Sequence, residues 1–125
     1  MSFKSLTQPL RDILDGVNMI EEFTAGMDFE AFRTNPMAVA AGERKLLTIG
    51  EAAVRLGREA PSIVPDIPWR QVRDLGNLLR HEYDKVDLAI IWKTVTDDLP
   101  ELKAAVQRAL ITPPHSKPES PTPKQ

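Results

Sequence analysis

Apolar residues recur at intervals of three and four along almost the whole of this 125-residue chain, and this is the spacing of one face of an α-helix. No segment shows sustained alternation of apolar and polar residues between hairpin turns, which would indicate a half-buried strand. Prolines, glycines and helix-capping residues divide the chain into four long helical stretches. The sequence therefore predicts an all-α fold, an up-and-down bundle of four main helices.

The expected helices cover about residues 10–23, 36–60, 69–83 and 88–110. Pro9 suits the first turn of the first helix, and Gly26 follows its end. Asp28 is expected to cap a short turn, and Asn35 and Asp87 are the expected N-caps of the second and fourth helices.

One proline interrupts the apolar spacing of the fourth expected helix. Pro100 removes a backbone donor and crowds the preceding turn. Asp98 and Glu101 have the spacing of a capping box, which is typical of a helix start. We therefore expect a kink or a restart of the helix near Pro100.

Residues 1–111 are expected to form one helical domain, and residues 112–125 a disordered tail. This tail holds five of the eleven prolines and almost no apolar residue, so it cannot contribute to a core. His115, the second of the two histidines, lies in it.

The composition excludes several classes of protein. There is no cysteine, so neither a disulfide nor a thiolate metal site is available. No apolar run is long enough to span a bilayer, and the N-terminus lacks the apolar core of a signal peptide. We expect a cytoplasmic protein with no membrane partner. The formal charge of −2 argues against coating nucleic acid by bulk electrostatics, but not against a local basic patch.

The third expected helix carries the residues best suited to chemistry. Imidazole is the side chain that most readily exchanges protons at neutral pH, and guanidinium is the one best shaped to hold a phosphate. At about 100° per residue, His81 lies within about 40° of Asn77 and Asp74. Other cations lie near this polar stripe, namely Arg70, Arg73 and Arg80. The combination suggests chemistry on a phosphodiester.

A simpler interpretation is that this stripe is the solvated face of an amphipathic helix. Arg70–Asp74 and Arg80–Asp84 have the spacing of ordinary ion pairs along a helix. Tyr83 falls near the apolar stripe and could be a core aromatic with its hydroxyl in water. No metal site or other cofactor is expected, because one histidine with scattered carboxylates gives no ligand spacing.

Several segments of the chain together resemble the HepT-like toxin family, small α-helical proteins with a HEPN domain. They are IGEAAVRL (49–56), PDIPWRQVRDLGNLLRHEY (65–83), VDLAIIW and DLPELK. The resemblance covers about residues 5–110, in order. It implies metal-independent RNA cleavage by a homodimer, the toxin of a bacterial toxin–antitoxin module. It also implies a partner, an MntA-type nucleotidyltransferase that acts as the antitoxin.

The signature of that family is an arginine, four to six intervening residues, a histidine, one residue and a tyrosine. His81 and Tyr83 match it, and Asn77 matches the polar residue that commonly follows the arginine. The usual place of the arginine, five residues before the histidine, is occupied by Gly76. Arg73 lies eight residues before His81 and is outside the spacing.

The departure at Gly76 leaves two alternatives open. In the first, Arg80, which adjoins His81, or Arg73 has taken over the role of the arginine. In the second, nuclease activity is weakened or lost. In an active site, the RNA 2′-hydroxyl would be the nucleophile and His81 the general base or acid. Arg80 or Arg73 would stabilise charge on the phosphate, and Asn77 would orient it.

Two further implications concern partners. In a homodimer, two copies of the helix would line one cleft and bring the two His81 side chains together. The nucleotidyltransferase would transfer AMP to Tyr83 and so block RNA by bulk and negative charge. Two competing hypotheses are a dimeric adaptor of the nucleotidyltransferase without catalysis, and a nucleotide-binding helical domain. The last lacks any glycine-rich phosphate loop.

Overall fold

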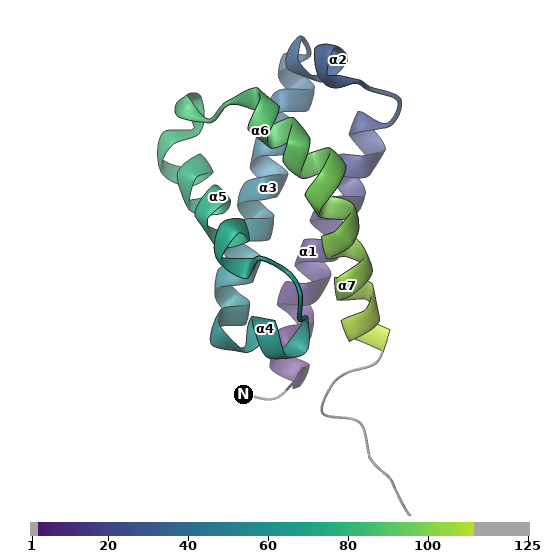
Figure 1. Cartoon of the computed structure of the whole chain (residues 1–125), viewed down its shortest axis with the longest axis vertical. Helices are drawn as coiled ribbons and strands as arrows, with labels where there is room; N and C mark the ends of the chain where they lie inside the picture. Colours follow the sequence, from purple (N-terminus) through teal and green to yellow (C-terminus); the bar gives the residue numbers. More distant parts are fainter. Residues whose placement is uncertain (1–2, 112–125) are drawn as a thin grey trace, which may run out of the picture.

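Four long helical segments make up the part of the chain that the computed structural model describes, residues 3–111 (Figure 1). They are α1 (Phe3–Thr24), α3 (Pro36–Leu56), α5 (Trp69–Glu82) and the continuous pair α6 (Leu88–Lys93) and α7 (Leu99–Ile111). Two short helices, α2 (Phe29–Arg33) and α4 (Ala60–Ile63), lie in the connections. Residues 3–111 contain no strand. The all-α prediction is confirmed, and the tail predicted for residues 112–125 lies outside the described residues.

The predicted capping residues are confirmed at three helix starts, because each side chain accepts a hydrogen bond from a free backbone N–H. Asp28 accepts from Ala31 at 2.8 Å, Asn35 from Ala38 at 3.1 Å and Asp87 from Ala89 at 2.9 Å. Pro36 occupies the first turn of α3. These starts depend only on local interactions, which explains why the sequence shows them.

The prediction that Pro9 lies in the first turn of the first helix is wrong. Helix α1 begins at Phe3 and contains Pro9 in its interior. The reason is tertiary packing, because Leu6 is as deeply buried in the core as Leu10 one turn later. Burial of an apolar side chain of this size contributes about 1.5–3 kcal/mol, which offsets much of the cost of about 3 kcal/mol for a proline in a helix interior.

The second helix ends earlier than predicted, at Leu56. Gly57 has a φ of 62°, the left-handed region that favours glycine, and it ends the helix there. A 3₁₀ turn (Gly57–Glu59) and α4 follow, so the proline-rich connector is partly helical.

Near Pro100 the chain stays helical. A π-helical turn (Thr94–Asp98) joins α6 to α7, and Leu99 has helical backbone angles. The wider turn accommodates the proline, and α6 and α7 run at an angle to each other on either side of it (Figure 1). Of the two alternatives predicted near Pro100, a kink or a restart, the structure has the kink.

Helix α3 lies at the centre of the bundle and packs against α1 on one side and α5 on the other. Helix α1 also packs against α7. In α5, Trp69 and Leu79 are buried and Val72 and Leu75 are partly buried, so these residues form the core face of this helix. The indole N–H of Trp69 donates to the Val64 carbonyl at 2.9 Å and fixes the start of α5 on the connector.

Candidate functional site

Two glycines set the distance between α3 and α5. A Cβ atom added to Gly50 would lie 2.7 Å from the Cα atom of Gly76, and one added to Gly76 would lie 2.8 Å from the Cα atom of Gly50. The two backbones are therefore in contact, and neither position has room for a side chain. The resemblance predicts the signature arginine at the position of Gly76, and this helix crossing leaves no room for an arginine there.

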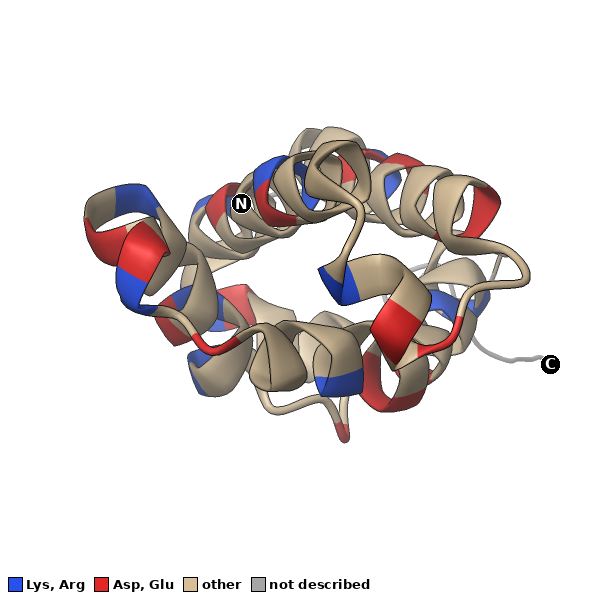
Figure 2. Cartoon of the chain, turned by 90° about the horizontal axis from the view of Figure 1, so that it is seen from above, with Lys and Arg blue, Asp and Glu red and all other residues tan. Residues whose placement is uncertain are grey.

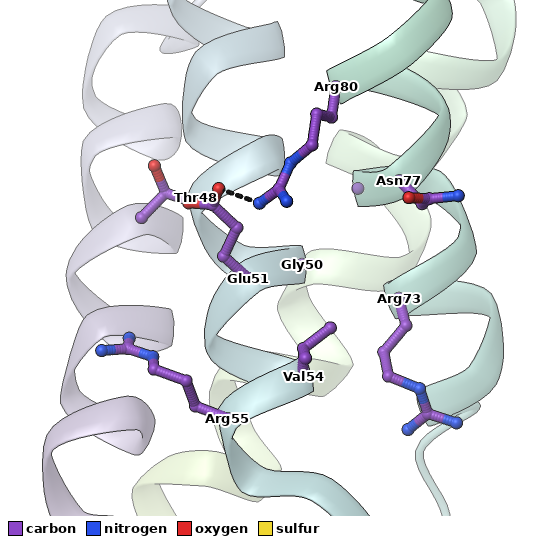
Figure 3. A pocket seen from close by; sticks show the side chains of 9 residues that line it. Thr48, Gly50, Glu51, Val54, Arg55, Arg73, Asn77 and Arg80 are labelled. Carbon is purple, nitrogen blue, oxygen red and sulfur yellow. Dashed lines mark hydrogen bonds and ion pairs between the residues drawn. The ribbon is translucent and has the colours of Figure 1, made fainter.

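A groove with a volume of about 480 Å³ lies beside this crossing. Figure 3 shows the side chains along it, which come from facing turns of the two helices. Helix α3 contributes Thr48, Glu51, Val54 and Arg55, and helix α5 contributes Arg73, Asn77 and Arg80. Three of the residues predicted for the site, Arg73, Asn77 and Arg80, therefore line one groove.

The arginines of this groove differ in their electrostatic surroundings. Arg80 reaches across the groove and forms an ion pair with Glu51 of α3 (Figure 3). Arg55 is held by Asp12 of α1 at 2.5 Å, and this hydrogen bond keeps the pKa of the Asp12 carboxyl below its ordinary value. Within residues 3–111, Arg73 makes neither an ion pair nor a side-chain hydrogen bond. Arg73 is thus the groove cation that is available to an anionic ligand.

The ion pairs expected along α5 are only partly present. Arg70 and Asp74 lie 3.9 Å apart, as predicted. The pair expected between Arg80 and Asp84 is replaced by the contact of Arg80 with Glu51. The helix ends at Glu82, and the 3₁₀ turn that follows moves Asp84 out of the helical register.

His81 and Tyr83 lie outside the groove. Both side chains are exposed, His81 one turn beyond Asn77 and Tyr83 at the start of the 3₁₀ turn (Tyr83–Lys85). Tyr83 has 62% of its surface exposed, so the interpretation of this residue as a core aromatic is wrong. The structure thus brings Arg73, Asn77 and Arg80 together and leaves the histidine on the adjoining outer face of α5.

Comparison with known proteins decides the family. The model of the "Ribonuclease HepT-like" family matches residues 13–109. The chain belongs to the HepT-like ribonuclease family. It is 35% identical over 107 residues to a protein of Methanocaldococcus jannaschii described as "Putative RNase", covering 86% of this chain and 98% of that one. It is 36% identical over 99 residues to the "Probable ribonuclease HepT" of Thermococcus cleftensis, covering 79% and 90%. No solved structure shows a significant match.

This HepT-like chain has site residues on α3 that sequence reasoning missed. Thr48, Glu51 and Arg55 follow one another at helical spacing along the groove. Glu51 meets Arg80 of α5, whereas the Arg55 side chain points towards α1 and binds Asp12 there (Figure 3). The segment IGEAAVRL contains Gly50 and, directly after it, Glu51. The place of Glu51 in the site depends on the contact between Gly50 and Gly76, and a single sequence does not display that contact.

Two other classes of site have no counterpart in residues 3–111 of this HepT-like protein. Among residues 3–111, no group of three or more histidine, cysteine, aspartate or glutamate side chains could hold a metal ion. None of the helices in the same range is long and apolar enough to cross a membrane.

Proposed function

We propose that this HepT-like protein is the toxin of a bacterial toxin–antitoxin module, a metal-independent endoribonuclease that acts as a homodimer in the cytoplasm. The observation that carries the proposal is the groove between α3 and α5, where Arg73 is uncompensated one turn before Asn77 and on the face next to exposed His81. A guanidinium without a carboxylate partner binds a phosphate without first breaking an ion pair.

The proposed reaction is an internal transesterification. The RNA 2′-hydroxyl gives its proton to His81, attacks the phosphorus atom and displaces the 5′-oxygen, which takes a proton from His81 of the partner subunit. The products are a 2′,3′-cyclic phosphate and a free 5′-hydroxyl. Asn77 orients the phosphate, and an arginine stabilises the negative charge that develops on its oxygens.

Arg73 and Arg80 are the candidates for that arginine, and their partners distinguish them. Arg80 adjoins His81, but Glu51 neutralises it in the unbound protein. Arg73 carries an uncompensated charge and lies about 12 Å along the helix axis from His81. We assign initial binding of the phosphate to Arg73 and expect Arg80 to contribute only after RNA has displaced Glu51.

Tyr83 is the proposed site of control by the antitoxin. Its exposure at the end of α5 makes the hydroxyl accessible to a second enzyme. That hydroxyl would attack the α-phosphate of ATP, forming a phosphodiester to AMP and releasing pyrophosphate. The added nucleotide would place negative charge two residues from His81, where it would repel RNA. The nucleotidyltransferase antitoxin implied by the resemblance would supply this activity.

A second candidate function is that of an adaptor that dimerises and binds the nucleotidyltransferase without cleaving RNA. Two observations favour it: the helix crossing excludes the signature arginine at Gly76, and His81 does not line the groove. An adaptor needs no accessible histidine beside a phosphate-binding cation.

Induced expression without the partner tests the two functions. Wild-type protein is expected to arrest growth, and His81→Ala protein is expected not to. Arg108→Ala removes a remote charge on α7 and serves as the control, which should still arrest growth. Absence of arrest by soluble, dimeric wild-type protein would favour the adaptor.

A further inference from the structure

A second hollow continues the groove towards the start of α5. It has a volume of about 640 Å³ and shares Val54 and Arg73 with the groove already described. The residues that matter for a ligand there are Val54, Arg58, Pro61, Pro68, Arg70 and Arg73. None of the predicted catalytic residues except Arg73 belongs to it.

The charge of this second hollow has one sign only. Three arginines line it, and none of the described residues that line it is acidic. Arg58 forms no ion pair within residues 3–111, and Arg70 contacts Asp74 only at 3.9 Å, with 89% of the Arg70 side chain exposed. Exposed pairs of this kind are weak. The hollow is therefore positively charged and open to an anion.

The concentration of arginine is unusual for this chain. The two hollows together hold Arg55, Arg58, Arg70, Arg73 and Arg80, which are five of the nine arginines, and none of the seven lysines. Elsewhere around the bundle, basic and acidic residues are interspersed (Figure 2). Arginine binds phosphate through a planar array of donors, whereas lysine acts as a point charge. This composition indicates recognition of phosphate and not general attraction of anions.

The shape and the other lining residues indicate single-stranded nucleic acid. Val54 has 60% of its surface exposed, and Pro61 and Pro68 are exposed beside it. They give the hollow an apolar surface on which a base can lie, with cations for the backbone around it. From Arg80 to Arg70 the helix rises about 15 Å, more than one phosphate needs.

We propose that Arg58 and Arg70 form a second phosphate-binding subsite, which takes single-stranded RNA on one side of the cleaved bond. The RNA backbone runs along α5 from Arg80 past Arg73 to this subsite. The inference rests on the proposed function only for the identity of the ligand, since binding along the groove does not require cleavage.

Binding of a fluorescent 12-nucleotide single-stranded RNA tests the subsite, measured by anisotropy over a range of salt concentrations. The full-length His81→Ala protein is used so that the RNA stays intact. Adding Arg58→Ala and Arg70→Ala is expected to weaken binding at least tenfold at low salt. It should also reduce the slope of log K against log salt by about 1.4, since each phosphate contact on a single strand contributes about 0.7.

The matched control adds Arg44→Ala and Arg108→Ala, which remove two exposed charges outside both hollows. It is expected to change the slope by much less. An equal loss in the two double variants, or no loss in either, would overturn the subsite. If wild-type protein binds the RNA in this manner but does not cleave it, the subsite stands and the proposed catalysis fails. If Arg58→Ala and Arg70→Ala leave affinity unchanged in the His81→Ala protein and cleavage unchanged in the protein with His81 intact, the subsite fails and the catalysis stands.

Discussion

Gly50 of α3 and Gly76 of α5 lie in direct backbone contact in the middle of the candidate site. This contact brings the two helices close enough for Arg80 to reach Glu51 and for Arg73 and Asn77 to share a groove with α3. Gly76 is thus required by the packing of α5 against α3, and the cations that α5 contributes to the groove come from neighbouring turns.

Introducing an arginine at position 76 should therefore harm the protein. We expect Gly76→Ala to destabilise it by about 1–3 kcal/mol, because the new Cβ atom meets the backbone of Gly50, and Gly76→Arg to destabilise it more. Urea denaturation followed by circular dichroism measures this, with Asn77→Ala on the exposed side as the control. A Gly76→Arg protein as stable as wild type would show that the helices do not cross as described.

The pair between Arg80 and Glu51 should compete with RNA. Glu51→Gln frees the Arg80 guanidinium, so we expect RNA to bind about 3- to 10-fold more tightly, with a change in stability below about 1 kcal/mol because the pair is exposed. Asp84→Asn removes an exposed negative charge four residues after Arg80 in the sequence, one that forms no ion pair within residues 3–111, and is the matched control. Equal effects of the two substitutions in an RNA titration would mean that only net charge matters.

Stability should depend on pH through Asp12 and Arg55. The folded protein lowers the pKa of Asp12, so its ionised form favours folding above the pKa of the unfolded chain. That contribution is lost as the pH falls through the pKa of the folded state. We expect Asp12→Asn to reduce the free energy of unfolding slightly at neutral pH and to leave it unchanged in strong acid. A difference between the two proteins that persisted in strong acid would contradict the assignment.

Tyr83 should be the residue that the nucleotidyltransferase modifies. After co-expression with that enzyme, we expect intact mass measurement to show added AMP on the wild-type chain and an unmodified Tyr83→Phe chain. Because Tyr83 is exposed, Tyr83→Phe should fold normally. AMP found on Tyr83→Phe would place the modification elsewhere.

Much of the fold can be predicted because its signals are local. Asp28, Asn35 and Asp87 each bond to a backbone N–H two or three residues away, so the caps are visible in the sequence. The first turns of α1 are not visible in the sequence, because the burial of Leu6 depends on neighbours distant in sequence and overrides the signal of Pro9.

The same difference between local signals and tertiary contacts applies to the candidate site. Arg73, Asn77 and Arg80 follow from the spacing on one helix, and they do share a groove. Glu51 lies 29 residues from Arg80, and Gly50 meets Gly76 only through tertiary packing. A helical projection places residues on faces but does not identify what lies opposite. For the same reason it grouped His81 with Asn77, although only Asn77 lines the groove.

We propose that this protein cleaves RNA through His81 without a metal ion. The most direct test incubates purified wild-type protein and His81→Ala with single-stranded RNA in the presence of EDTA and analyses the ends of the fragments. We predict fragments with 2′,3′-cyclic phosphate and 5′-hydroxyl ends from wild-type protein and none from His81→Ala. Intact RNA with folded, dimeric wild-type protein, or equal cleavage by both proteins, would contradict the claim.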